Sequence, residues 1–225
     1  RDLFIKSKLA NKIKSSVIPG SGVDIERFKS TRTTNKGKRF LFSGRLIGDK
    51  GVVEYLKAAS TVLKKFPDRE FLLIGELGSN NKTALSKGEL ETYTDQFPQI
   101  KYLGKTDNIS NLLNDIDVMV LPSYREGLSK TLIEAAAMSL PIITTDVPGC
   151  KDVVKQDYNG ILCKVKCEES LAKSMQEMIE ISEKKRHNMG LNGRTLTEKF
   201  FLEEKIIQHY SNQISKLQKE SISAR

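Results

Sequence analysis

Short apolar segments rich in β-branched residues alternate with longer amphipathic segments along most of this 225-residue chain. The apolar segments are almost continuously hydrophobic, as is typical of strands covered on both faces, and the segments between them have helical spacing. Strand–helix–strand repetition of this kind predicts an α/β fold with one doubly wound, mainly parallel sheet. We expect strands at 16–19, 39–43, 70–74, 100–103, 117–121, 141–145 and 160–163, and helices at 51–66, 82–96, 108–115, 129–139, 149–156 and 168–184.

The loops that follow the predicted strands are the first places to search for a functional site, because ligands of such sheets bind at the carboxyl ends of the strands. Several strands end at a glycine or proline that turns the chain, namely Gly44, Gly75, Gly104 and Pro122. The loops at this edge of the sheet are therefore 43–51, 75–80, 104–107, 122–129 and 145–150.

Composition narrows the classes of function. The chain carries 37 basic and 28 acidic residues, a net charge of +9, which would attract nucleic acid, anionic lipid or phosphorylated small molecules. Three cysteines without Cys-x-x-Cys spacing argue against a disulfide scaffold or zinc ribbon and fit a reducing, cytoplasmic compartment. No apolar run reaches the roughly 18 residues of a membrane-spanning helix, and the first residues do not resemble a secretory signal. A start without methionine leads us to expect a fragment that lacks its upstream half.

The loop and helix start after the strand at 117–121 combine features of a site for an anion and a sugar. The first backbone N–H groups of that helix have no helical acceptor and point to the sheet edge; they belong to Leu128, Ser129, Lys130 and Thr131. Glu126 and Glu134 would flank a diphosphate bound there, one near a hexose and one near a ribose, since a carboxylate accepts two hydroxyl hydrogen bonds. The spacing alone leaves open that Glu126 complements the helix dipole and Glu134 is a solvated charge.

The loop after the strand at 39–43 is the second candidate. Gly44 lets the chain approach a ligand closely. Arg45 offers a planar set of N–H donors to phosphate oxygens, and Lys50 offers the compact positive charge of its ammonium group. The loop is not a Walker A motif, because no Ser or Thr follows the lysine. Taken alone, it is also compatible with a structural turn bearing two exposed cations. Together with the helix start at a neighbouring strand, it favours a diphosphate ligand.

The motifs occur in a defined order: Gly44-Arg45, Lys50-Gly51, a Glu-x7-Glu pair at 126 and 134, then 146–150 and Asn159-Gly160. In this order, over about residues 17–171, the chain resembles the C-terminal, donor-binding domain of a GT-B retaining glycosyltransferase of family 4. The sequence around Glu126 is similar to that of bacterial capsule, O-antigen and N-glycan assembly enzymes. The resemblance implies a Rossmann-like C-terminal half of a GT-B fold.

The resemblance also implies a role for each candidate residue. Arg45 and Lys50 would neutralise the departing diphosphate as electrostatic catalysts, Glu126 would complete the catalytic set by binding hydroxyls of the transferred sugar, and Glu134 would bind the ribose. Further contacts to the donor would come from Gly44, Gly127, Leu128, Ser129, Lys130 and Thr131, with Lys105 and Thr106 beside the base. No metal and no cofactor is expected, since the basic residues take that role.

For the whole protein we expect transfer of a hexose or N-acetylhexosamine from a nucleotide-diphospho-sugar, UDP-linked, to a lipid-linked or glycan acceptor with retention. Residues 1–198 would form the nucleotide-sugar domain, and 199–225 a terminal amphipathic helix and tail. The apolar stripe of that helix must be buried against its own sheet or against a missing N-terminal domain that supplies the acceptor pocket. The fragment alone would be inactive, and the basic surface would attract the enzyme to the anionic inner face of the cytoplasmic membrane.

Two other classes of function stay open. A GT-B UDP-sugar 2-epimerase uses the same scaffold, although the Glu-x7-Glu pair and the Gly-Arg…Lys-Gly loop point away from it. A non-catalytic nucleotide- or nucleic-acid-binding module would explain the net charge, but only 7% of residues are aromatic and no RNP, KH or helix-turn-helix motif is present. Asp115-Ile116-Asp117 spells a metal-binding motif at the amino end of a strand, opposite the ligand edge, so we interpret it as a structural turn.

Overall fold

The computed structural model describes residues 2–13, 15–18, 20–78 and 80–223, with side chains described as far as residue 218. It confirms the predicted α/β class: within these residues, six strands form one sheet in the order β3-β2-β1-β4-β5-β6, and every pairing is parallel. The strands are β1 (Arg39–Ser43), β2 (Glu70–Ile74), β3 (Ile100–Tyr102), β4 (Val118–Leu121), β5 (Ile142–Thr145) and β6 (Gly160–Cys163). Strand order reverses between β1 and β4, and such a reversal is where doubly wound sheets bind ligands.

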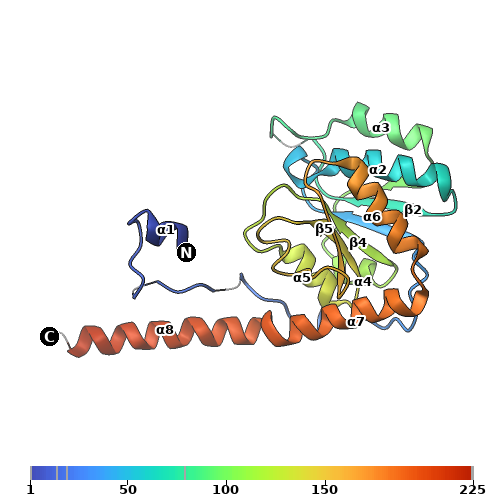
Figure 1. Ribbon diagram of the computed structural model, residues 1–225. Coiled ribbons are helices and arrows are strands. Elements are labelled where there is room, and N and C mark those ends of the chain that lie inside the picture. The colour runs from blue at the N-terminus through green and yellow to red at the C-terminus, as the bar shows by residue number, and fades with distance from the viewer. Residues whose placement is uncertain (1, 14, 19, 79, 224–225) are drawn as a thin grey trace.

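Helices cover both faces of the sheet (Figure 1). On one face lie α2 (Val52–Lys65), α3 (Lys87–Gln96) and α6 (Glu168–Glu180), and on the other α5 (Lys130–Ala137) packs against α7 (Glu183–Phe200). The remaining elements are α1 (Asp2–Lys6), the 3-10 helix η1 (Gly48–Lys50), α4 (Ile109–Leu113) and α8 (Glu203–Ser223).

The core lies between the sheet and these two helical layers. Every residue of β4 and β5 is buried, as their uninterrupted apolar sequences predicted. Helix α2 is anchored to the sheet by Tyr55, whose ring is fully buried and whose hydroxyl donates a hydrogen bond of 2.9 Å to the carbonyl oxygen of Phe40. The Phe40 and Phe71 rings stack beside it, with centroids 5.2 Å apart. Burial of each such aromatic side chain contributes about 1.5–3 kcal/mol, so β1 and the loop that follows it are firmly held.

Two predicted elements are wrong. Residues 16–18 form no strand, and Val17 is exposed; residue 19 lies outside the described residues. The chain first pairs with the rest of the domain at the bridge between Val23 and Leu202. Residues 149–156 form turns instead of a helix, because the buried side chain of Asn159 takes up their backbone groups. Its amide nitrogen donates to the Val153 carbonyl at 3.0 Å, and its oxygen accepts from the Lys155 N–H at 2.7 Å.

Other helices begin or end at residues that differ from the predicted ones, because side chains cap their ends. Helix α3 begins at Lys87 rather than at 82, because Ser86 and Glu89 form a reciprocal capping box. The helix predicted over 168–184 ends at Glu180, where Arg186 donates through Nη1 to the carbonyl oxygens of Met178 (2.6 Å) and Ile181 (2.9 Å). These contacts satisfy the last carbonyls of α6 and let α7 start in a new direction.

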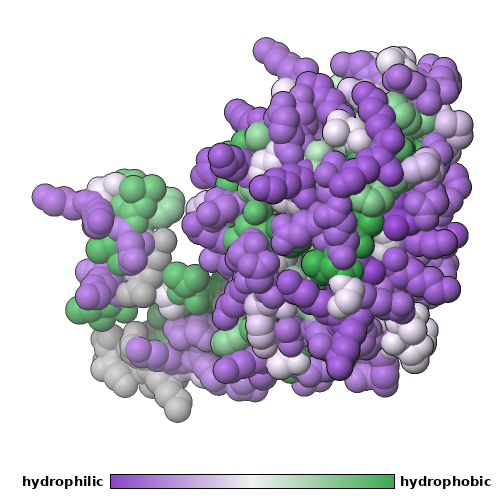
Figure 2. All heavy atoms as spheres, turned by 45° about the vertical axis from the view of Figure 1, so that its right-hand side comes forward, coloured by the Kyte–Doolittle hydropathy of each residue, from purple (hydrophilic) through white to green (hydrophobic). Residues whose placement is uncertain are grey.

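Both ends of the described chain expose apolar side chains. Helix α8 leads away from the domain (Figure 1), and beyond Ile206 its apolar residues are half exposed or more: Ile207, Tyr210, Ile214 and Leu217. Only Phe201 and Ile206 of the predicted stripe are well buried. The N-terminal segment also presents hydrophobic surface beside a mainly hydrophilic domain (Figure 2), with Leu3, Phe4, Leu9 and Ile13 exposed. The predicted domain boundary at 198 falls within α7 and stays a prediction. Among the described helices, none combines the length and apolar character that crossing a bilayer requires.

Candidate active site

The loops after β1 and β4 are locked together at the point where strand order reverses. Gly51 adopts a φ of +73°, and a Cβ there would lie 2.2 Å from the carbonyl oxygen of Pro122. The backbone N–H of Tyr124 donates to the Asp49 carbonyl at 2.8 Å, and the Ser123 hydroxyl donates to the same oxygen at 3.2 Å. The loop that carries Lys50 therefore has a fixed position relative to the loop that carries Glu126.

A cleft of about 710 Å³ opens between these two loops. Four predicted site residues share it: Arg45, Lys50, Glu126 and Gly127. Its other lining residues were not predicted, and they are Ile47, Asp49, Asn81, Tyr124, Arg125 and Lys166. Four cations line the cleft against two carboxylates, so its electrostatic potential favours an anionic ligand.

Lys50 and Glu126 form an ion pair inside the cleft. The Lys50 Nζ lies 2.5 Å from Oε1 of Glu126, and the two side chains are only 20% and 10% exposed. A charge-assisted hydrogen bond in such a partly desolvated site is stronger than a solvent-exposed pair. Two of the three predicted catalytic groups therefore neutralise each other across the cleft.

The loop after β5 packs against the backbone of Glu126. Gly149 has a φ of +83°, and a Cβ there would lie 2.5 Å and 2.6 Å from the carbonyl oxygens of Glu126 and Gly127. The hydroxyl of Thr145, at the end of β5, donates to the carbonyl of Ser123. The resemblance gave no role to residues 146–150, and the structure shows that Gly149 packs against the backbone of the loop that carries Glu126.

The start of α5 lies beside the loop after β5. Ser129 is the N-cap residue, yet its side chain makes no capping hydrogen bond. Of the four amides predicted to be free, that of Ser129 donates to the Gly149 carbonyl in a long bond of 3.4 Å. The amides of Lys130 and Thr131 lie in the first helical turn, where no helical acceptor exists. The anion site predicted here is thus smaller than expected.

Glu134 lies on α5 apart from the lining of the cleft. Its side chain is 16% exposed, and the Lys130 Nζ is 3.9 Å away. Burial raises the pKa of Glu134 above its ordinary value, and the charges of Lys130 and Arg27 offset this only in part. A carboxylate held in an unfavourable environment is typical of a residue kept for binding rather than for stability.

Replacing Glu134 by glutamine is expected to stabilise the fold at neutral pH. A raised pKa means that the folded protein loses stability as pH rises through that pKa, so the variant should have the higher Tm at pH 7. The difference should shrink below pH of about 4.3, the ordinary pKa of glutamate, where both forms are uncharged. Glu91→Gln is the control, because Lys87 and Glu91 form the same i,i+4 pair on exposed α3. Thermal melts over this pH range measure both; a lower Tm for Glu134→Gln at pH 7 would contradict the argument.

The residues predicted to flank a base lie elsewhere. Lys105 and Thr106 follow β3, the edge strand, and both are exposed; neither lines the cleft. The Thr106 hydroxyl oxygen accepts a hydrogen bond of 3.2 Å from the backbone N–H of Asn108. Gly44 ties the loop after β1 to the end of β2, since its N–H donates to the Ile74 carbonyl at 3.0 Å. The structure therefore does not bring Lys105 and Thr106 into contact with the other candidates.

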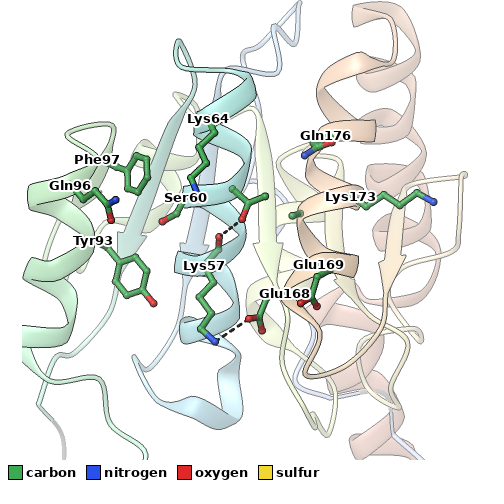
Figure 3. A pocket seen from close by; sticks show the side chains of 12 residues that line it. Lys57, Ser60, Lys64, Tyr93, Gln96, Phe97, Glu168, Glu169, Lys173 and Gln176 are labelled. Carbon is green, nitrogen blue, oxygen red and sulfur yellow. Dashed lines mark hydrogen bonds and ion pairs between the residues drawn. The ribbon is translucent and has the colours of Figure 1, made fainter.

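A second hollow of about 580 Å³ lies on the outer surface between α2, α3 and α6 (Figure 3). Lys57 from α2 reaches across it and donates to Glu168 at 3.0 Å. Its walls carry charges of both signs and the aromatic rings of Tyr93 and Phe97 (Figure 3). It contains none of the predicted site residues and lies over the helices rather than at the strand ends, so the cleft beside Glu126 is the better candidate.

The Asp-x-Asp motif is structural, as interpreted from its position. Asp117 lies just before β4, and its Oδ2 accepts hydrogen bonds from the backbone N–H groups of Lys38 (2.8 Å) and Arg39 (3.0 Å). Its Oδ1 faces the Arg32 guanidinium at 3.6 Å, and burial lowers the pKa of Arg32. The carboxylate thus joins β4 to the segment that leads into β1, at the edge opposite the cleft.

Comparison with known proteins identifies the family. The model of the family "Glycosyl transferases group 1" matches residues 23–196. The capsular polysaccharide biosynthesis glycosyltransferase CapM of Staphylococcus aureus is 28% identical, over 97% of this chain and 60% of CapM. The UDP-Gal:alpha-D-GlcNAc-diphosphoundecaprenol alpha-1,3-galactosyltransferase of Escherichia coli is also 28% identical, over 88% of this chain and 55% of its own length.

Among solved structures, the C-terminal domain of the glycosyl transferase group 1 family protein LpcC from Francisella tularensis is similar with a TM-score of 0.70 and 25% identity. The match covers 80% of this chain and 99% of that domain. The chain spans between about half and three-fifths of the length of the curated relatives it matches. Since the family model covers most of the chain and the sheet has the expected topology, the protein belongs to the glycosyl transferases group 1 family, with the fold of the C-terminal half of a GT-B enzyme.

Proposed function

We propose that this chain is the donor-binding half of a retaining glycosyltransferase, which transfers a hexose or N-acetylhexosamine from a UDP-sugar to a lipid-linked or glycan acceptor. The observation that carries the proposal is the convergence of Arg45, Lys50 and Glu126 in one cleft at the strand-order reversal. The name of the Escherichia coli relative, which pairs a UDP-sugar with a diphosphoundecaprenol-linked sugar, supports the choice of nucleotide and acceptor class.

The cations of the cleft suit the chemistry of the leaving group. When the bond between the sugar C1 and the diphosphate oxygen breaks, the bonding electrons remain on that oxygen and its negative charge grows. Arg45 and Lys50 stabilise this charge without reorganisation, because the loop that carries them is fixed by Gly51. The first-turn amides of α5 supply further N–H donors to the phosphates.

In this scheme, binding of the donor breaks the ion pair between Lys50 and Glu126, and each residue then contacts the donor. A diphosphate competes with Glu126 for the Lys50 ammonium. Once released, the Glu126 carboxylate accepts hydrogen bonds from hydroxyls of the transferred sugar. One internal contact is thereby exchanged for two contacts with the donor.

The remaining candidate residues bind the nucleoside part of the donor. In this proposal Glu134 binds the ribose, and Lys105 and Thr106, which do not line the cleft, contact the base where the donor extends beyond it. The basic side chains replace a divalent metal in charge neutralisation, so no metal or cofactor takes part. The acceptor pocket belongs to the remainder of the complete enzyme, and the net charge of +9 attracts it to an anionic membrane surface that carries the acceptor.

Calorimetric titration of the 225-residue chain with UDP tests the donor site. Arg45→Ala and Glu134→Ala should each weaken UDP binding by about 1–3 kcal/mol, the cost of losing a charge-assisted contact, which is about 5- to 150-fold in Kd. Arg39→Ala is the control, because Arg39 pairs with Glu70 at the opposite, amino end of the sheet. Absence of binding at millimolar UDP, or equal losses in all three variants, would show that the site is misplaced.

A further inference from the structure

Lys166 occupies an unfavourable backbone conformation at the edge of the cleft. It follows β6, and its φ of +55° lies in the left-handed region that side chains rarely adopt. Nothing in the turn requires a lysine there, since glycine takes up this conformation without strain. Strain of this kind persists where the side chain has a task that the fold alone does not set.

The side chain of Lys166 points to an aromatic ring that is itself fixed. Its Nζ lies 4.8 Å from the centroid of the Tyr124 ring. The Tyr124 hydroxyl donates to Oε1 of Glu54 at 2.5 Å, and burial and the Glu54 charge raise the pKa of Tyr124, so the phenol stays protonated. An ammonium over a partly exposed ring gains little, about 0.5–1 kcal/mol, and this contact positions Lys166 without neutralising its charge.

The cleft contains more positive charge than its carboxylates balance. Lys50 is paired with Glu126, whereas Arg45, Arg125 and Lys166 have no ion-pair partner within the described part of the chain. Arg45 enters from the loop after β1, but Arg125 and Lys166 enter from the loops after β4 and β6, further along the sheet. One diphosphate, held by Arg45 and Lys50, would leave Arg125 and Lys166 without a direct ion-pair partner among the described residues.

We propose that Lys166 and Arg125 form a second phosphate-binding subsite, which takes the diphosphate of the acceptor while the donor's diphosphate contacts Arg45 and Lys50. This proposal rests on the proposed function and extends it. It places a determinant for diphosphate-linked acceptors in the donor-binding half, on the side of the cleft that the loop after β6 supplies.

The test measures binding of inorganic pyrophosphate by calorimetry to the 225-residue chain that has first been saturated with UDP. The unsubstituted chain should bind pyrophosphate, and Lys166→Gly should weaken this binding about five-fold or more, as expected for loss of one charged contact. The Kd for UDP should rise by a smaller factor than the Kd for pyrophosphate, because the donor's diphosphate contacts Arg45 and Lys50 rather than Lys166. Lys164→Gly is the matched control, because Lys164 is an exposed lysine of the same loop that does not line the cleft.

Lys166→Gly also separates binding from folding. Because glycine relieves the strain of the positive φ, this variant should keep or raise the Tm while it loses pyrophosphate affinity. Unchanged pyrophosphate affinity in Lys166→Gly would overturn the proposal. So would complete displacement of pyrophosphate by UDP, which would assign Lys166 to the donor's own diphosphate. Failure of the unsubstituted chain to bind UDP would refute the proposed function instead, whatever its affinity for pyrophosphate.

Discussion

Gly51→Ala is expected to lower the free energy of unfolding by about 3 kcal/mol or more and to abolish UDP binding. Two costs add at this position. A side chain at a φ of +73° is strained by roughly 1–2 kcal/mol, and overpacking typically costs a further 1–3 kcal/mol. The overpacked neighbour is the carbonyl oxygen of Pro122, 2.2 Å from the new Cβ, so relief requires the loops of β1 and β4 to separate. Chemical denaturation and UDP calorimetry measure the two effects.

Gly78→Ala provides a matched control for that experiment. Gly78 has nearly the same φ, +71°, but a Cβ there would meet nothing within 4 Å. It should therefore lose only the conformational cost, about 1–2 kcal/mol, and retain UDP affinity. If the two variants lost equal stability, the contact between Gly51 and Pro122 would not be what holds the two loops together.

Lys50→Met should lower kcat for sugar transfer by the complete enzyme about 10²- to 10³-fold, the usual effect of removing one preorganised donor to a developing oxyanion. Methionine keeps the length of the side chain but cannot neutralise the leaving diphosphate, and it leaves the 10%-exposed Glu126 carboxylate without its partner. The initial rate of UDP release from the sugar donor measures the effect. Lys57→Met is the control, since Lys57 pairs with Glu168 on the outer surface; a loss below about 10-fold for Lys50→Met would remove Lys50 from the catalytic set.

Much of the fold could be predicted because the strands are continuous apolar runs that end in turn residues. The bounds of β1, β2 and β6 are those expected from the sequence. The start of α3 is also encoded locally, since Ser86 and Glu89 have the spacing of a capping box, although the predicted helix began at 82. The false helix at 149–156 has a different cause: its backbone is captured by the Asn159 side chain, a choice that periodicity does not reveal.

The candidate site also has some residues that the sequence predicts and others that depend on packing. Arg45, Lys50 and Glu126 were found because each follows a strand, and strand ends share one edge of a parallel sheet. Lys166 also follows a strand, β6, but it lies outside the loops predicted to carry the site. Which strands neighbour each other decides whether such a residue reaches the cleft, and that order is a property of the whole sheet. The burial of Glu134 and the ion pair between Lys50 and Glu126 likewise depend on packing between distant segments.

The segment bearing Glu126 is held from two directions, by Gly51 against Pro122 and by Gly149 against the Glu126 carbonyl. Such a scaffold leaves little freedom for the backbone, so adaptation to a new substrate must come from side chains at the periphery. Arg125, Lys130 and Lys166 are exposed, and replacing them disturbs none of the glycine contacts. A change in specificity that preserves the fold would thus be made at exposed side chains such as these rather than in the backbone that carries Glu126.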